Sequence, residues 1–280
     1  MIQEAIRRLI DLALTEDIGD GDHSSLACIP EGAMGKARLI IKEKGIIAGI
    51  DIAAYVFKRI DKRIQLSECL TDGSKVKPGD TGFIAEGSRQ SLLKSERLVL
   101  NIIQRMSGIA TNTRMYVDAV KDYRVKILDT RKTTPGFRVF EKEAVRIGGG
   151  ENHRMGLYDM IMLKDNHIDY AGGIRNAIIK ANEYLKETKK HLPIVIEARN
   201  LDELKQILDQ GMVNRIMLDN FSIPETKIAV KLVKGKYELE SSGGITLETV
   251  RSYAKCGVDY ISIGALTHHI KSMDISLKAI

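Results

Sequence analysis

The sequence predicts an α/β protein with a small mixed α/β part followed by a parallel βα part. Residues 32–89 are rich in turns and short extended runs, whereas after about residue 120 short apolar runs alternate with helix-like segments. The length of 280 residues suits one large domain or two. Hydrophobic residues make up 44% and charged residues 29%, which excludes a disordered or fibrous chain.

The first part is expected to begin with an amphipathic helix, because apolar residues recur at helical spacing. They are Ile2, Ile6, Leu9, Ile10 and Ala13. Pro78, Gly79 and Asp80 then form a turn signal between two extended runs. Residues 91–119 again have helical spacing, and Arg97 and Arg105 interrupt their apolar face. The expected buried face consists of Leu93, Val99, Leu100, Ile103 and Met106.

The second part repeats an apolar run that closes on a polar or glycine residue. The closing positions are Asp129, Lys164, Glu197, Asp219, Ser241 and Gly264. Their spacings are 35, 33, 22, 22 and 23 residues, and the shorter ones fit a strand, a helix and two loops. Helix-like segments lie between them at residues 173–186, 201–210 and 247–256. Because parallel strands end at one edge, the closing side chains are expected to meet where α/β barrels carry their chemistry, although one or two of them could be helix caps.

A group of cations follows the first two predicted strands. The motif DTRKTTPGFR contains Arg131, which can grip a carboxylate with two hydrogen bonds, and Lys132, a compact charge. The motif GGGENHR adds His153 and Arg154, and Lys164 closes the next strand. A solvated charge run is the alternative, but burying these groups together without an anion would be costly. The pattern therefore predicts a polycarboxylate or phosphate ligand.

Two acids and two glycine loops follow. Glu197 and Asp219 suit Mg²⁺, a developing sugar cation, or salt bridges to nearby lysines. The loops SSGGIT and GALTH each lead from a predicted strand toward a helix, where backbone N–H groups are typical phosphate donors.

The remaining composition limits the function classes. The net charge of +6 favours anionic partners. Cys28, Cys69 and Cys256 lie far apart, which excludes a disulfide framework or zinc cluster and fits a reducing cytoplasm. The longest apolar stretch, residues 46–57, contains Asp51 and is much shorter than a membrane span. We expect no membrane or export segment.

Six motifs, in this order, closely resemble the quinolinate phosphoribosyltransferase (carboxylating nicotinate-nucleotide pyrophosphorylase) family: LDTRKTTPGFR, GGGENHRMGLYDMIMLKDNHI, IEARNLDEL, IMLDN, ESSGGIT and GVDYISIGALTHH. LTEDIGDGDHSS and LNIIQRMSGIAT are similar to the same family. The resemblance implies an N-terminal α/β sandwich domain at residues 1–110, with residues 268–280 packing back on it. It also implies an incomplete, open α/β barrel of about six to seven parallel strands at residues 111–267.

The resemblance further implies transfer of ribose 5-phosphate from phosphoribosyl pyrophosphate to quinolinate, with loss of CO₂, in NAD synthesis. The residues implied for quinolinate and pyrophosphate binding are Arg105, Arg131, Lys132, His153, Arg154 and Lys164. Arg105 would come from the neighbouring subunit of a homodimer, and higher assembly is left open. Glu197 and Asp219 would lie near the ribose and bind Mg²⁺, and they would share catalysis with Lys132 and Lys164. The residues implied around the 5-phosphate are Ser242, Gly243, Gly264 and His268, with His269 as a rival imidazole.

Three other functions are weighed against this one. A phosphoribosyltransferase of the same fold could use another nitrogen heterocycle, or nicotinate itself. A Schiff-base aldolase could use Lys164 as its nucleophile. A nucleic-acid binder is suggested only by the net charge, and the 5% aromatic content without Trp argues against it.

Overall fold

The computed structural model describes residues 2–280, which cluster into two compact units. The first unit contains residues 2–114, Thr133–Gly149 and Leu266–Ile280. The second contains Met115–Lys132 and Gly150–Ala265. The units thus divide the chain differently from the expected 1–110 and 111–267, since residues 133–149 cluster with the first unit.

The helices and strands follow the expected alternation. The helices are α1 (Ile2–Ile18), α2 (His23–Cys28), α3 (Ile50–Ile60), α4 (Arg89–Ala119), α5 (Arg138–Ile147), α6 (Asp165–Ala171), α7 (Ile174–Thr188), α8 (Leu201–Gln210), α9 (Ile223–Val233), α10 (Val250–Ala254) and α11 (Ala265–His268). The strands are β1 (Met34–Ile41), β2 (Gly45–Ile46), β3 (Gln65–Ser67), β4 (Lys75–Val76), β5 (Thr81–Ser88), β6 (Lys126–Leu128), β7 (Ile161–Leu163), β8 (Ile194–Ala198), β9 (Arg215–Asp219), β10 (Glu238–Ser242), β11 (Tyr260–Ser262) and β12 (Ile275–Ala279).

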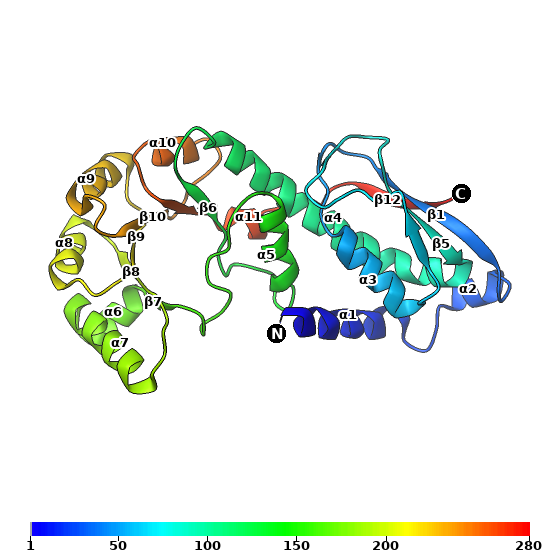
Figure 1. The fold of residues 1–280 in the computed structure, drawn as a ribbon, viewed down its shortest axis with the longest axis horizontal. Coiled ribbons are helices and arrows are strands. Elements are labelled where there is room, and N and C mark those ends of the chain that lie inside the picture. Colours follow the sequence, from blue (N-terminus) through cyan, green and yellow to red (C-terminus); the bar gives the residue numbers. More distant parts are fainter. Residues whose placement is uncertain (1) are drawn as a thin grey trace. The chain divides into compact units, whose positions relative to one another are not determined.

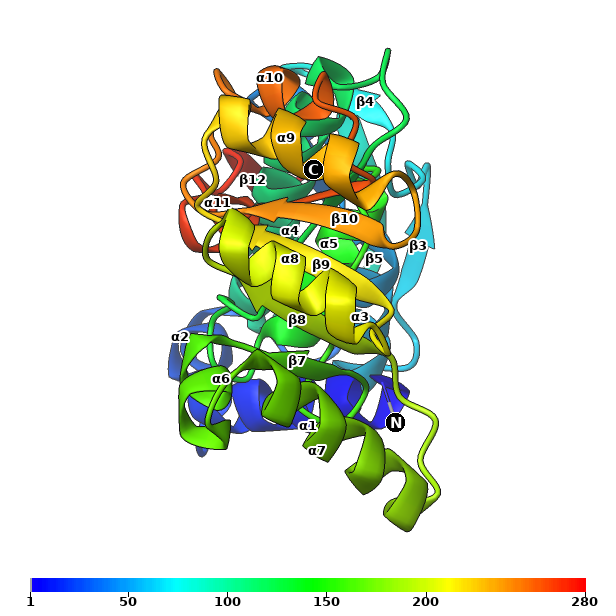
Figure 2. The ribbon, with the colours of Figure 1, turned by 90° about the vertical axis from the view of Figure 1, so that its left-hand side faces the viewer.

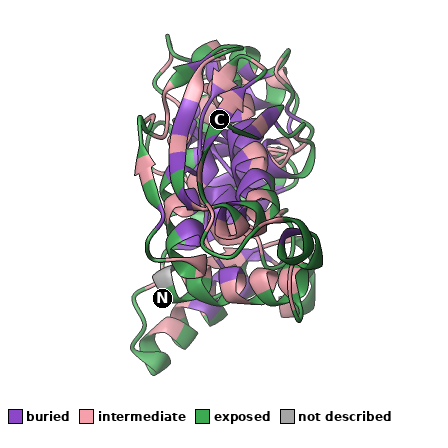
Figure 3. Cartoon of the chain, turned by 90° about the vertical axis from the view of Figure 1, so that its right-hand side faces the viewer, coloured by how far each residue is buried: buried purple, intermediate pink, exposed green. Residues whose placement is uncertain are grey.

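The first unit is built on a four-stranded antiparallel sheet in the order β12-β1-β5-β3 (Figure 1). The last strand, β12, pairs with β1 so that Leu277 lies beside Leu39. Helix α3 packs its apolar side toward the sheet, where the rings of Phe57 and Phe83 meet edge to face at 5.7 Å. Figure 3 shows the buried positions gathered along the strands and helices of this unit. The predicted turn between extended runs is confirmed at Gly79, which has φ +94°.

The long helix α4 confirms the predicted helix and corrects its buried face. Leu93 is exposed, and Leu92 is buried in its place. Helical spacing explains the exchange, because Leu92 lies on the same stripe as Val99, whereas Leu93 is turned about 100° away. Gly108 allows the C-terminal segment to pass close to the helix, since a Cβ there would lie 2.3 Å from the Lys271 carbonyl oxygen.

The second unit is an open barrel-like layer of six parallel strands in the order β6-β11-β10-β9-β8-β7. Among the described residues the edge strands β6 and β7 do not pair with each other. A single parallel bridge between Leu128 and Glu151 extends the sheet beyond β6. Helices α7, α8 and α9 cover its outer face (Figure 2). The predicted incomplete α/β barrel is confirmed.

The two faces of this sheet differ in chemistry. Strand register places Glu197, Met217, Glu240 and Tyr260 at one level, so their side chains share the inner face. The next level points outward to the helices and contains buried apolar residues such as Leu218. The expectation of simple apolar strands therefore describes the outer face, whereas the inner face is largely polar.

Two further predictions concern the whole chain. Cys28, Cys69 and Cys256 are free thiols, as expected. No helix within residues 2–280 is both long enough and apolar enough to cross a membrane.

Candidate functional site

Lys164 and Glu197 meet at the ends of the neighbouring strands β7 and β8. The Lys164 Nζ donates a hydrogen bond to Glu197 Oε1, so the predicted convergence of these two residues is observed. Lys164 is also the N-cap of α6, and its backbone N–H donates to His167 Nδ1 at 3.1 Å. Glu197 is buried, whereas 43% of the Lys164 side chain is exposed. The lysine is therefore held by the carboxylate and still open to a ligand.

Arg154 lies within electrostatic range of Glu197. Burial lowers the pKa of the Arg154 guanidinium, and the nearby Arg131 lowers it further, while Asp159 and Glu197 act in the opposite direction. Two guanidinium groups therefore repel each other in a poorly hydrated place. A bound dianion would relieve this repulsion.

Asp129 shapes the loop that carries these cations. It is fully buried, and its carboxylate accepts hydrogen bonds from the His153 N–H at 2.8 Å and from Asn152 Nδ2 at 2.6 Å. Its own N–H donates to the Glu151 carbonyl oxygen. Asp129 thus ties the end of β6 to the segment before Arg154, which is a structural role for this strand-closing residue.

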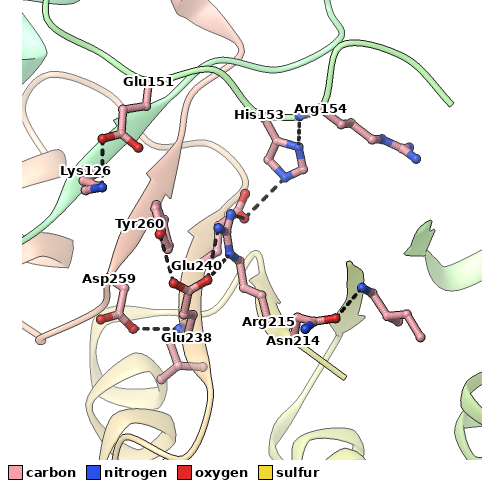
Figure 4. Close-up of polar contacts among 12 residues, drawn as sticks. Lys126, Glu151, His153, Arg154, Asn214, Arg215, Glu238, Glu240, Asp259 and Tyr260 are labelled. Atoms are coloured by element: carbon pink, nitrogen blue, oxygen red, sulfur yellow. Dashed lines mark hydrogen bonds and ion pairs between the residues drawn. The ribbon is translucent and has the colours of Figure 1, made fainter. Parts of the chain in front are cut away.

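The imidazole of His153 is turned toward the inner face of the barrel sheet (Figure 4). Its Nδ1 accepts a hydrogen bond from the Arg154 N–H at 2.7 Å. Its Nε2 lies 3.4 Å from Glu240 Oε2 on β10. Both ring nitrogens therefore face groups of the protein.

Asp219 and Gly243 lie at the ends of the neighbouring strands β9 and β10. Asp219 ends β9 beside Ser242, and the Asn220 N–H donates to the Ser242 carbonyl oxygen at 2.9 Å. Gly243 has φ +95°, and a Cβ there would lie 2.2 Å from Asn220 Oδ1. Only glycine fits this position without displacing Asn220, so Gly243 is needed for the packing of its loop against Asn220.

Arg105 belongs to α4 in the first unit. Its Nε and Nη2 lie 2.8 and 2.6 Å from Glu141 Oε1, and Nη2 also donates to Thr134 Oγ1 at 2.9 Å. Glu141 is fully buried and accepts the Thr134 N–H as well, which explains why residues 133–149 cluster with α4. Sequence reasoning missed Glu141, because its partner is 36 residues away.

His268 and His269 follow in the first unit, at the end of α11. Their Nδ1 atoms are in contact and their rings lie edge to face, with centroids 4.5 Å apart. The two imidazoles form one polar group.

The predicted residues are thus divided between the two units. Those in the second unit are Arg131, Lys132, His153, Arg154, Lys164, Glu197, Asp219, Ser242, Gly243 and Gly264. Arg105 and His268 lie in the first unit. Ser242, rather than the predicted closing residue Ser241, shares the inner face with Asp219, while Ser241 is buried on the opposite face.

The acids fit a magnesium ion that shares its ligands with a substrate. Within residues 2–280 no group of three or more His, Cys, Asp or Glu side chains is placed to hold a metal. The Asp219 carboxylate makes no side-chain hydrogen bond or ion pair there, and Glu197 lies on the adjacent strand. Mg²⁺ is commonly held by one or two carboxylates together with substrate phosphates and water, which this donor set allows.

Comparison with known proteins gives consistent matches. Residues 22–107 match the model of the quinolinate phosphoribosyl transferase N-terminal domain, and residues 109–278 match that of the C-terminal domain. The rice protein named nicotinate-nucleotide pyrophosphorylase [carboxylating], chloroplastic, is 45% identical over 98% of this chain and 77% of its own length. Quinolinate phosphoribosyltransferase [decarboxylating] 1 of Nicotiana glauca is 44% identical over 98% of this chain and 82% of its own. A solved nicotinate-nucleotide pyrophosphorylase from Francisella tularensis superposes with a TM-score of 0.92 at 42% identity, covering 99% of this chain and 96% of that one.

Proposed function

Because the chain belongs to the quinolinate phosphoribosyltransferase family, we propose that it transfers ribose 5-phosphate from phosphoribosyl pyrophosphate to the ring nitrogen of quinolinate. The products are nicotinate mononucleotide, pyrophosphate and CO₂, and the enzyme is a pentosyltransferase of NAD synthesis. The observation that carries this proposal is the contact between Lys164 and Glu197 at adjacent strand ends, with Arg154 in electrostatic range.

Quinolinate is a dianion, and the cations of the second unit suit its two carboxylates. We assign Arg131 and Arg154 to them, with Lys132 and Lys164 available for a carboxylate or for pyrophosphate. Arginine binds a carboxylate through two parallel hydrogen bonds and so fixes its direction as well as its position. Holding the ring in line with the sugar supplies much of the rate enhancement.

Glu197 and Asp219 supply the opposite charge. As pyrophosphate leaves, the ribose gains oxocarbenium character, and nearby carboxylates stabilise that positive charge. Mg²⁺ bound by these two residues would neutralise charge on the leaving pyrophosphate. Lys164 holds Glu197 in place through their contact.

Decarboxylation follows from the product of the transfer. The new N-glycosidic bond makes the ring a pyridinium, and its positive nitrogen stabilises the electron pair left on the adjacent ring carbon when the carboxylate departs as CO₂. That carbon then takes up a proton from water, which gives nicotinate mononucleotide. The loss of CO₂ needs a site that does not over-stabilise the carboxylate. We further assign Ser242, Gly243, Gly264 and His268 to the ribose 5-phosphate.

We also propose that the enzyme is a homodimer in which Arg105 serves the partner's site. Its guanidinium is already fixed by Glu141, and 29% of its side chain remains exposed. A cytoplasmic location is part of the same proposal and agrees with three free thiols.

The direct test is incubation with phosphoribosyl pyrophosphate, Mg²⁺ and quinolinate carrying ¹⁴C in its 2-carboxylate. Nicotinate mononucleotide and ¹⁴CO₂ should appear in equal amounts, and nicotinate in place of quinolinate should give no product. Turnover of nicotinate instead would favour the same-fold alternative. Covalent trapping of a carbonyl substrate on Lys164 by borohydride would favour the aldolase.

Arg131→Ala should weaken quinolinate binding by about 2–5 kcal/mol, and a loss below about 1 kcal/mol would contradict the carboxylate assignment.

A further inference from the structure

A network of charged groups with the buried Glu240 at its centre lies on the inner face of the barrel sheet, and the proposed reaction does not use it (Figure 4). His153 Nε2 lies 3.4 Å from Glu240 Oε2, and Arg215 Nη1 lies 3.1 Å from the same oxygen. The Arg215 Nε and Nη2 both donate to Glu238 Oε2 at 3.2 Å, and the Tyr260 hydroxyl donates to Glu238 Oε1 at 3.0 Å. The guanidinium carbon lies 3.7 Å from the Tyr260 ring centroid.

Burial of this network costs free energy of folding, because charged groups lose their hydration. Glu240 is fully buried, and only 14% of the Arg215 side chain is exposed. Burial alone would raise the pKa of Glu240, but His153, Ser262 and Arg215 together hold it below its ordinary value, so the carboxylate stays ionised. A buried ion pair is often no more stable than an apolar pair of the same volume, so its presence here points to a task other than stability.

The hydrogen bonds of His153 indicate that task. Nδ1 accepts the Arg154 N–H, so the ring proton of the neutral imidazole resides on Nε2, which faces Glu240. Asp129 holds the His153 backbone N–H from the other side. The imidazole lies between the Glu240 carboxylate and the Arg154 backbone N–H. The position of the carboxylate therefore constrains the position of the Arg154 backbone.

We infer that Glu240, held by Arg215, is a positioning residue that fixes the His153 imidazole and, through it, the quinolinate-binding Arg154. His153 then acts inside the protein rather than as a direct ligand of the substrate. The inference rests on the proposed function, since it takes Arg154 as a quinolinate-binding residue. The Arg154 side chain is fixed at its other end, where Nη1 donates to the Met160 carbonyl oxygen at 3.3 Å.

The test compares two isosteric variants on one strand. Glu240→Gln removes the charge that faces His153, and Glu238→Gln removes a charge from the same arginine without touching His153. Titration calorimetry should show that Glu240→Gln, once its fold is verified by circular dichroism, weakens quinolinate binding about 10-fold and leaves phosphoribosyl pyrophosphate binding within about 2-fold. Glu238→Gln should bind both substrates as the wild type does.

A second variant and a spectroscopic measurement guard against misfolding. Arg215→Met/Glu240→Leu replaces the buried pair with apolar groups and removes the carboxylate that faces Nε2. In ¹⁵N-histidine NMR spectra, assigned with His153→Gln, the wild type should show a protonated Nε2 and an unprotonated Nδ1, and the double variant should lose that preference. An unchanged tautomer, unchanged quinolinate affinity in both Glu240 variants, equal weakening of both substrates, or equal effects at Glu238 and Glu240 would overturn the inference. Failure of the wild type itself to bind quinolinate would instead overturn the proposed function.

Discussion

Glu141 in the first unit and Glu240 in the second are both fully buried, and each pairs with an arginine. The two arginines differ in what they have left to offer. Arg215 is engaged by Glu238, Glu240 and the Tyr260 ring on all sides. Arg105 is gripped along one edge, and its Nη1 makes no hydrogen bond within the described residues. A buried acid can therefore serve either to enclose an arginine or to present it.

The comparison separates two uses of the same costly pair. An arginine held on one edge has already lost much of its rotamer freedom, so binding an anion costs less entropy. An arginine whose three nitrogens each donate to a neighbouring carboxylate, as in Arg215, is held in place by those carboxylates. The following predictions test this distinction, beginning with the largest expected effect.

The enclosed pair should be sensitive to removal of one member. Arg215→Met leaves Glu240 buried without its cation, and we expect a loss of about 3–5 kcal/mol of stability. Calorimetry should record this as a fall in Tm of roughly 10 °C. Arg215→Met/Glu240→Leu should recover most of the loss. A double variant as unstable as the single one would show that the pair is a net source of stability.

The presented arginine should matter for turnover in the neighbouring subunit. Arg105→Lys keeps a cation beside Glu141 but loses the planar fork, so kcat/KM for quinolinate should fall about 100-fold, or about 2.7 kcal/mol. Mixing Arg105→Lys with the inactive Lys164→Ala chain should restore about a quarter of wild-type activity, because half of the dimers then hold one intact site. Absence of any recovery, with subunit exchange shown by mass spectrometry, would place Arg105 in its own subunit's site.

The acid behind the presented arginine should have a smaller effect. Glu141→Gln keeps the shape and removes the charge that fixes Arg105, and KM for quinolinate should rise about 10-fold, which is about 1.4 kcal/mol. Glu143→Gln is the matched control, because Glu143 lies on the same helix and its ion pair is with the exposed Arg146. Equal effects of the two substitutions would contradict a specific role for Glu141.

The pair of Asp61 and the exposed Arg63 should have the smallest effect on stability of the pairs compared. Hydrogen bonds from the Arg63 side chain and backbone, together with Ser91, lower the pKa of Asp61 from 3.8 to about 2. The folded-state pKa lies below the unfolded value, so the stabilisation is present above pH 3.8 and is lost as the pH falls toward 2. Since 82% of the Arg63 side chain is exposed, Asp61→Asn should lower Tm by roughly 1–3 °C at pH 7 and by less at pH 2. A Tm difference that is constant with pH would contradict this assignment.

The sequence predicted residues that stand at repeated strand ends. It did not predict charged residues whose partners are far away in the sequence. Lys164 and Glu197 were predictable because a parallel strand ends at each, and parallel strands share an edge. Glu240 lies inside a strand, and nothing in ESSGG shows that its side chain faces the polar interior. Glu141 lies in a helix with no spacing relation to Arg105. Leu93 and Leu92 are adjacent leucines, so the buried one depends on the exact phase of α4.

The pairing of β12 with β1 has a consequence for the order in which the chain folds. Ile41 and Ile275 are partners across the first sheet, so the ribosome must add more than two hundred residues before that sheet is complete. At about 5–20 residues per second, this delay lasts roughly 10–50 s. All residues of the second unit are synthesised within that interval. The edge of β1 that will pair with β12 therefore stays unpaired on the nascent chain throughout that interval. A chaperone that binds exposed strand edges would have this whole time to act there.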